Sequence, residues 1–255
     1  MATYLITGAS RGIGLELTKQ LLELPASKVS TVFAVARNVE SDAIRQLVKE
    51  YPDRIYPVSA SVDDTASVQE AAETVKTKLS GHGLDVLVNN AGIAGLTPGS
   101  IKDMEPDQLA QILDVNVIGT QRVTSAFMPL LEQGTQKKII NMSSGLGSFA
   151  YATRTATMPT DAYIISKTAL NMLTLRWANW YSDAGFTILA ISPGWLKTDM
   201  GNEQADLSVE VGVAEVKRLI LESGREQNGK FLNINVPETE GTNYQFEYDG
   251  KGIPW

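Results

Sequence analysis

The chain opens with a strand-like segment and a glycine-rich loop, TYLITGASRGIG, which covers residues 3–14. The apolar run at 3–7 predicts a short buried strand, and apolar residues at helical spacing after Gly14 predict a helix. The glycines could simply form a turn, because glycine adopts positive φ angles without a steric penalty. The alternative is a dinucleotide site, since amide groups and the positive end of a helix dipole attract phosphate. The spacing GxxxGxG differs from the usual GxGxxG, so the rest of the chain must decide.

Composition and charge exclude several classes of protein. The chain has 255 residues, of which 43% are hydrophobic and 20% charged, as in ordinary globular proteins. A formal net charge of −7 repels a long phosphate backbone, so we expect no nucleic-acid partner. No apolar run reaches ~18 residues, so we expect no membrane partner and a cytoplasmic location.

The chain also lacks the side chains of two common kinds of catalytic site. It contains no cysteine, which excludes disulfides, thiolate metal sites and a cysteine nucleophile. Its single histidine, His82, lies in a predicted surface turn. A Ser-His-Asp triad or a multi-histidine metal site would need residues that the sequence does not have, and we expect no metal.

Strand-like and helical patterns alternate along the chain. Strands are expected at 3–7, 30–37, 54–62, 84–92, 137–144 and 186–195, and helices after Gly14 and at 40–51, 64–79, 106–133 and 161–183. This alternation predicts an α/β fold, a doubly wound parallel sheet with helices on both faces, in a single domain spanning 1–255. Two segments interrupt the pattern: a loop insertion at 145–162, and a C-terminal extension at 229–255 with strand-like runs at 230–234 and 244–248.

Small and polar residues follow each predicted strand. Ligands of an open parallel sheet bind beyond the carboxyl ends of its strands. The residues placed there are Gly8, Ser10, Arg11, Gly12, Ile13 and Gly14; Arg37 and Asn38; Ser61, Val62 and Asp63; Asn90, Ala91 and Gly92; Ser143 and Ser144; Pro193 and Gly194. Their concentration at one edge favours a cofactor site.

The helix expected from Asp161 carries Tyr163 and Lys167. Positions i and i+4 share one face of a helix, so the two side chains could merely be neighbours on a surface. A chemical role is the alternative, because a nearby ammonium lowers the pKa of a phenol and fits it for acid–base work. No histidine is available for that task.

The sequence resembles the short-chain dehydrogenase/reductase family across essentially the whole chain. It matches four motifs of that family in order: TGxxxGxG at 7–14, NNAG at 89–92, YxxxK at 163–167 and PGxxxT at 193–198. The resemblance implies a Rossmann-type fold and an NADP-dependent oxidoreductase. It also implies that Tyr163, Lys167, Leu196 and Thr198 contact the cofactor together with the residues at the sheet edge.

The resemblance further implies a catalytic tetrad of Asn116, Ser144, Tyr163 and Lys167, with Ser143 as the alternative serine. In that family Tyr163 would protonate the carbonyl oxygen, and Ser144 would hydrogen-bond it. Lys167 would lower the pKa of the tyrosine and hold the nicotinamide ribose. Asn116 would position a water molecule that links Lys167 to solvent.

The sequence departs from the usual family pattern in two places, and its long loop and C-terminal tail indicate a branch of the family. Ser61 stands where the family usually has an aspartate that contacts adenine, so that contact is weaker or is replaced by Asp63. The interval from Ser144 to Tyr163 is longer than usual. The long loop and the ending YDGKGIPW resemble the sniffer and C-factor branch, including fungal norsolorinic acid ketoreductase-type enzymes, which implies a role in secondary metabolism.

The implied activity is NADPH-dependent carbonyl reduction. The second predicted strand ends in Arg37 and Asn38 without an acidic residue, so Arg37 and Arg11 are expected to bind the 2′-phosphate of NADPH. An apolar or aromatic ketone or aldehyde is expected, because apolar side chains fall in the segments that would form its pocket: Ile93, Leu96, Leu146, Phe149, Tyr151, Met158, Trp195, Leu196 and Met200.

Two other functions remain open on the same fold. One is a non-catalytic dinucleotide-binding sensor or signalling module, which would not need both Tyr163 and Lys167. The other is an epimerase or dehydratase, for which no nucleotide-sugar domain is visible. We also expect the helices at 106–133 and 161–183 to pair two copies into a homodimer, although relatives with a long loop before the tyrosine are sometimes monomers.

Overall fold

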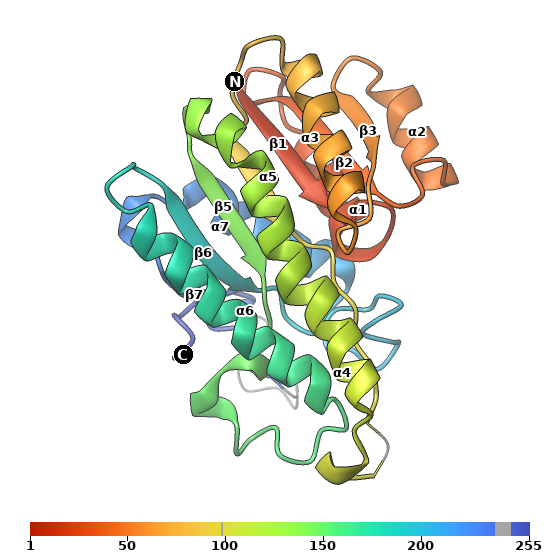
Figure 1. Cartoon of the computed structure of the whole chain (residues 1–255), viewed down its shortest axis with the longest axis vertical. Helices are drawn as coiled ribbons and strands as arrows, with labels where there is room; N and C mark the ends of the chain where they lie inside the picture. Colours follow the sequence, from red (N-terminus) through yellow and green to blue (C-terminus); the bar gives the residue numbers. More distant parts are fainter. Residues whose placement is uncertain (98, 238–245) are drawn as a thin grey trace.

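A computed structural model describes residues 1–97, 99–237 and 246–255. In these residues, seven parallel strands form one sheet in the order β3-β2-β1-β4-β5-β6-β7 (Figure 1). The strands are β1 (Ala2–Thr7), β2 (Val29–Ala36), β3 (Ile55–Ser59), β4 (Val86–Asn89), β5 (Lys138–Met142), β6 (Thr187–Ser192) and β7 (Phe231–Asn233). The order reverses between β1 and β4, where a doubly wound sheet opens its ligand crevice.

Helices cover both faces of this sheet. One face carries α1 (Gly12–Leu22), α2 (Asp42–Glu50) and α7 (Val209–Glu222), and the other carries α3 (Thr65–Leu79), α4 (Pro106–Leu113), α5 (Gly119–Gln133) and α6 (Asp161–Trp180). The predicted α/β, doubly wound, Rossmann-type domain is therefore confirmed. In the described parts of the chain, no helix combines the length and the apolar character that a membrane span requires.

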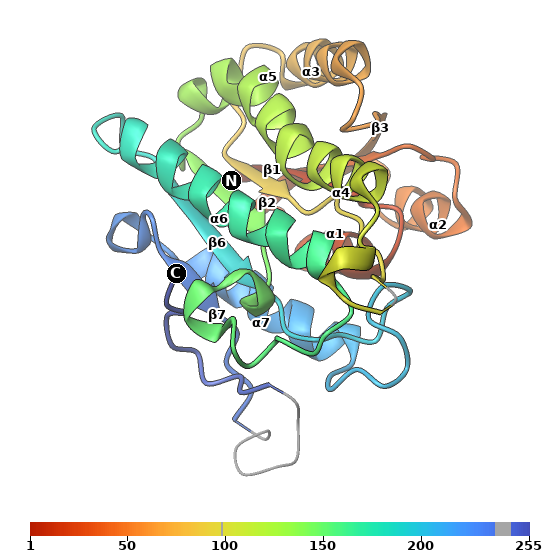
Figure 2. The ribbon, with the colours of Figure 1, turned by 60° about the horizontal axis from the view of Figure 1, so that its bottom comes forward.

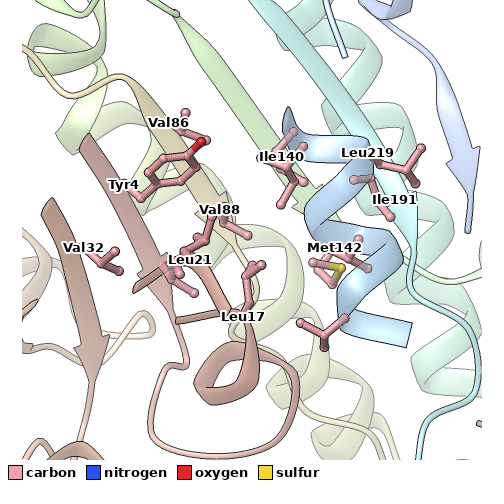
Figure 3. Packing of buried hydrophobic residues seen from close by; sticks show 14 of the residues in the cluster. Tyr4, Leu17, Leu21, Val32, Val86, Val88, Ile140, Met142, Ile191 and Leu219 are labelled. Atoms are coloured by element: carbon pink, nitrogen blue, oxygen red, sulfur yellow. The ribbon is translucent and has the colours of Figure 1, made fainter. Parts of the chain in front are cut away.

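The two hydrophobic cores follow from the alternation of side chains along the strands. Tyr4 and Ile6 of β1 face the layer of α1 and α7, whereas Leu5 between them faces the layer of α3 and α5. Figure 3 shows Leu17 and Leu21 of α1 and Leu219 of α7 packing with residues of β1, β4, β5 and β6 in the first of these cores. Strands buried on both faces read as continuous apolar runs, which is why they were visible in the sequence.

The structure differs from the expected elements in several places, among them the strand expected at 186–195, which ends at Ser192. The helix expected at 106–133 is divided by a π-helical turn at Asp114–Ile118, in which the Thr120 hydroxyl donates to the carbonyl of Asn116 at 3.0 Å. Helix α7 was missed, although its buried apolar residues at 213, 216, 219 and 220 have helical spacing. The strands expected at 54–62 and 84–92 end early, at Ser59 and Asn89, because the residues that follow form the loops at the sheet edge.

The loop insertion and the C-terminal extension pack against each other below the sheet (Figure 2). The insertion forms two 3₁₀ turns, Gly145–Gly147 and Phe149–Tyr151, before α6 begins. The Ser148 hydroxyl donates to the carbonyl of Pro254 at 2.5 Å, and the Trp255 ring stacks on Phe231 of β7 with centroids 5.4 Å apart. Part of the strand expected at 244–248 lies outside the described residues, and its described residues, 246–248, are not in a strand.

Candidate active site

Two cavities meet at the carboxyl edge of the sheet. The first, of about 450 Å³, lies between β1 and β4, and the second, of about 840 Å³, lies under the insertion and the tail. Both are lined by Ile13, Ser143, Tyr163, Pro193, Thr198 and Met200. The Tyr163 side chain therefore lies at the junction of two spaces, each large enough for part of a small-molecule ligand.

The first cavity brings together most of the residues that were assigned to a cofactor. It is lined by Gly8, Ser10, Arg11, Gly12, Ile13, Arg37, Asn38, Ser61, Val62, Asn90, Ala91, Gly92, Tyr163, Lys167, Pro193 and Thr198. Gly194 and Leu196 line only the second cavity, and Gly14 lines neither. Sequence reasoning missed Val35, Ala36, Ala60, Val115, Met142 and Asp199; Val35, Ala36 and Ala60 lie at strand ends, a position that could have indicated them.

Glycine is required at each of three positions in the opening loop, for different structural reasons. Gly8 and Gly12 have φ angles of +69° and +54°, which other residues adopt with strain. A Cβ atom on Gly8 would also lie 2.9 Å from the Cα of Ala91. Gly14 is needed for close packing, because a Cβ there would collide with the carbonyl oxygen of Gly8 and with the side-chain nitrogen Nδ2 of Asn90. The loop and the start of α1 thus leave backbone N–H groups at the cavity, as an anion site requires.

Polar side chains at the far end of the first cavity are already engaged with one another. Arg11 Nη1 lies 3.0 Å from Asp199 Oδ2 in an exposed ion pair. The Ser61 hydroxyl donates to the carboxylate of Asp63, and this hydrogen bond lowers the pKa of Asp63, with a smaller contribution from the charge of Arg37. Arg11 and Arg37 therefore line the same cavity, as expected, and Asp63 lies beside Ser61.

Three elements place the four candidate catalytic residues. Tyr163 and Lys167 lie one turn apart on α6, Ser144 follows β5, and Asn116 lies in the π-helical turn. The Lys167 ammonium donates to the carbonyl of Met142 at 2.8 Å and lies 5.5 Å from the centroid of the Tyr163 ring. The Ser144 hydroxyl lies near the Tyr163 hydroxyl and acts to lower its pKa.

The two serines after β5 are in different environments. The buried Ser143 hydroxyl donates to Asn171 Oδ1 at 2.6 Å. Ser143 lines both cavities, but its hydroxyl is engaged with Asn171. Ser144 lines only the second cavity and lies beside Tyr163, and its oxygen accepts from the amide of Leu146 at 3.2 Å. This geometry favours Ser144 over Ser143 as the serine that could contact a ligand beside the tyrosine.

The Asn116 side chain holds the loop after β4. Its Oδ1 accepts from the amide of Ile93 at 2.8 Å, and its Nδ2 donates to the carbonyl of Ile93 and to the Ser166 hydroxyl, both at 2.9 Å. Gly92 lies between Asn116 and Lys167, and a Cβ there would be 3.2 Å from Asn116 Oδ1. The water-positioning role of Asn116 stays a prediction.

Burial dominates the acid–base properties of the pair on α6. It raises the pKa of Tyr163 to about 12, and the hydrogen bond with Ser144 acts in the opposite direction. Burial also lowers the pKa of Lys167 to about 8, because an ammonium loses its hydration there. The lowering of the pKa of Tyr163 by the charge of Lys167 stays a prediction.

The second cavity contains most of the apolar residues expected to line it. Leu96, Leu146, Tyr151, Met158, Trp195, Leu196 and Met200 all do so. Ile93 lines the first cavity instead, and Phe149 lines neither, since its side chain is 75% exposed on the outer side of a 3₁₀ turn. Sequence reasoning missed Arg154 and the tail residues Phe246, Tyr248 and Ile253, which reach the cavity from far along the chain.

No group of three or more His, Asp or Glu residues that could hold a metal ion occurs in the part of the chain that the structure describes. At the junction of the cavities, two hydroxyl groups, those of Tyr163 and Ser144, lie beside the Lys167 ammonium.

Comparisons with known proteins agree with this arrangement. The profile of the family described as short chain dehydrogenase matches residues 2–207. The NADPH-bound carbonyl reductase from chicken fatty liver aligns over 100% of this chain and 99% of its own, with 31% identity and a TM-score of 0.85. The carbonyl reductase Sniffer of D. melanogaster aligns over 100% of both chains, with 30% identity and a TM-score of 0.86. The C-signal protein of Myxococcus xanthus is 33% identical over 172 residues, 68% of this chain and 93% of that protein.

Proposed function

The chain belongs to the short-chain dehydrogenase family and is an oxidoreductase, and from this premise we propose that it reduces an apolar or aromatic ketone or aldehyde with NADPH. The observation that carries the proposal is the position of Tyr163. Its side chain lies beside Ser144, at the place where the first cavity meets the larger apolar one.

The first cavity fits a dinucleotide phosphate. Gly8 and Gly12 allow a ligand to approach the backbone, and the amide groups at the start of α1 can bind a pyrophosphate. Arg11 and Arg37 line the same cavity, and a guanidinium offers several donors and a permanent charge to a 2′-phosphate. When bound, NADPH would supply the hydride for carbonyl reduction.

The side chains at the junction would supply the rest of the chemistry. Tyr163, which stays protonated at neutral pH because its pKa is about 12, would donate its proton to the carbonyl oxygen. Ser144 would hydrogen-bond the same oxygen and stabilise the charge that develops on it. Lys167 would hold a positive charge beside the ring of Tyr163 and bind the nicotinamide ribose. A protonated Tyr163 suits the reduction of a carbonyl compound, because oxidation of an alcohol would need the phenolate as the base.

The rate of reduction should depend on the protonation of Lys167. With NADPH saturating, we expect kcat to be level below about pH 7 and to fall as the pH rises through about 8, where the ammonium becomes neutral. Tyr163 would add no further change in this range, because its pKa is about 12. A pH profile of kcat tests this, and the profile of Lys167→Arg should lose the alkaline fall. A parent rate that stays level well above pH 8 would contradict the assignment.

The two arginines should set the preference between coenzymes. Replacing Arg37 by Asp introduces a carboxylate that repels a 2′-phosphate and accepts from a 2′-hydroxyl, so the ratio of Kd values should shift toward NADH by about 10- to 100-fold. Arg11→Ala should weaken NADPH binding more than NADH binding. Titrations of intrinsic fluorescence with each coenzyme measure both effects.

A matched variant distinguishes loss of a contact with the coenzyme from loss of the ion pair between Arg11 and Asp199. Asp199→Ala also removes the contact between Arg11 and Asp199, but it leaves the guanidinium in place. It should therefore not weaken NADPH binding as Arg11→Ala does. If the parent protein binds and uses NADH as well as NADPH, the assignment of both arginines fails.

A panel of carbonyl compounds tests the proposed substrate class. We expect NADPH to be consumed with apolar and aromatic ketones or aldehydes, because the second cavity contains Trp195, Met158 and Leu146. A clear preference for small charged keto acids would contradict this class. The second candidate, a dinucleotide-binding signalling module, is supported by the similarity to the C-signal protein of Myxococcus xanthus. Tight NADPH binding without turnover on any carbonyl compound would favour it.

The remaining expectations stay proposals. Ile118, Ile165 and Met172 expose apolar surface on the helices that we expect to pair in a homodimer, with exposed fractions of 50%, 39% and 57%. We also propose a cytoplasmic location, because the sequence has no long apolar run, and a role in secondary metabolism, on the resemblance to the sniffer and C-factor branch.

A further inference from the structure

A loop that follows β6 contributes to both cavities. We call residues 195–207 the roof loop. It places Thr198 and Asp199 at the first cavity and Trp195 and Gln204 at the second. Its two ends are joined, since the amide of Lys197 donates to the carbonyl of Leu207 at 2.9 Å and the amide of Leu207 donates to the carbonyl of Trp195 at 3.2 Å. The position of this loop therefore determines the shape of both cavities.

A tail residue holds both ends of the roof loop. The Tyr248 hydroxyl accepts from the amide of Trp195 at 3.2 Å and donates to Asp206 Oδ2 at 2.6 Å. Its ring is 3% exposed and packs so closely on the turn before the loop that a Cβ on Gly194 would lie 3.0 Å from Tyr248 Cε1. One phenol thus joins the first and last parts of the loop.

Tyr248 is itself held by the sheet. The amide of Val236 donates to the carbonyl of Tyr248 at 2.7 Å, and the amide of Gly250 donates to the carbonyl of Ile234 at 2.9 Å. The tail then pairs with β7, where the amide of Ile253 donates to the carbonyl of Phe231 at 2.8 Å. Backbone hydrogen bonds therefore join the tail around Tyr248 to β7 and to the residues that follow it.

We propose that Tyr248 is a positioning residue that fixes the roof loop and thereby sets the affinity of the second cavity for the carbonyl substrate. The inference rests on the proposed function for its kinetic part and on the contacts alone for its structural part. Tyr163, Ser144 and Lys167 come from α6 and from the end of β5, so loss of the Tyr248 hydroxyl leaves their positions unchanged.

Tyr248→Phe tests the proposal, because it removes the hydroxyl and keeps the ring. We expect KM for the carbonyl substrate to rise by about 5- to 20-fold, as for the loss of one or two partly buried hydrogen bonds, while kcat changes by less than about threefold. Without any ligand, amide hydrogen exchange in residues 195–207 should become faster, whereas exchange in α7 should not change.

Two further variants complete the experiment. Tyr56→Phe removes a phenol hydroxyl from β3, remote from both cavities, and should change neither KM nor exchange in the roof loop. Asp206→Asn replaces the carboxylate that accepts from Tyr248, and should raise KM and roof-loop exchange in the same direction. The double variant of Tyr248→Phe and Asp206→Asn should be less impaired than the two separate effects multiplied, because Asp206→Asn weakens a contact that Tyr248→Phe already removes.

The outcomes separate this proposal from the proposed function. If the parent reduces carbonyl compounds and Tyr248→Phe leaves KM and roof-loop exchange unchanged, the positioning role is wrong and the reductase stands. A fall in kcat with KM unchanged would also overturn it. If the parent reduces no carbonyl compound, the proposed function fails, and unchanged exchange in Tyr248→Phe and Asp206→Asn would still refute the contact's role.

Discussion

Tyr163→Phe should lower the rate of carbonyl reduction by about 10²- to 10⁴-fold while leaving the Kd for NADPH nearly unchanged. The variant removes the phenol hydroxyl at the junction of the two cavities and retains the ring that packs beside Lys167. The carbonyl oxygen would then have to take its proton from water. Turnover under saturating NADPH and a separate binding titration measure the two quantities.

The binding titration is the control for folding, since a misfolded variant would lose both rate and affinity. Turnover close to that of the parent would show that the proton comes from another group. Weakened NADPH binding together with an unchanged rate per bound complex would assign Tyr163 to binding alone.

Ser144→Ala should lower kcat by about 10²- to 10³-fold, whereas Ser143→Ala should change it by less than about threefold. The Ser144 hydroxyl lies beside that of Tyr163 and lines the second cavity, so its loss removes a donor from the developing oxyanion. Ser143 is turned to Asn171, and its loss should instead reduce the free energy of unfolding by about 1 kcal/mol. Steady-state kinetics and denaturant unfolding of both variants measure the pair of effects.

The opposite pattern would move the catalytic role one residue back along β5. A severe loss of rate in Ser143→Ala with a mild one in Ser144→Ala would contradict the assignment. Equal losses in both variants, accompanied by equal losses of stability, would mean that the segment acts only as a structural support.

The parts of the fold that could be predicted from the sequence are those fixed by local patterns. The apolar runs of β1 and β6 predict buried strands because both faces of each strand are covered, as Leu5 and Ile6 show by entering different cores. The opening loop could be predicted because Gly8 and Gly12 have positive φ angles that favour glycine. In these cases a few neighbouring residues determine the local backbone geometry.

Features that depend on distant residues could not be predicted in this way. The i, i+4 spacing of Tyr163 and Lys167 indicated that they are neighbours, but burial, which sets their pKa values, comes from the whole fold. The contact of Tyr248 with Trp195 joins positions 53 residues apart, and nothing near Trp195 in the sequence indicates it. The π-helical turn that contains Asn116 likewise interrupts a stretch whose apolar spacing is that of an ordinary helix.

The central claim is that Tyr163 donates a proton to a carbonyl oxygen while NADPH is consumed. The most direct test is to incubate the protein with NADPH and an aromatic ketone or aldehyde, and to measure coenzyme oxidised and alcohol formed in the same sample. The account predicts equal amounts of both, at a rate that falls at least about 10²-fold in Tyr163→Phe. Oxidation of NADPH without alcohol, or alcohol formation at an undiminished rate in Tyr163→Phe, would contradict it.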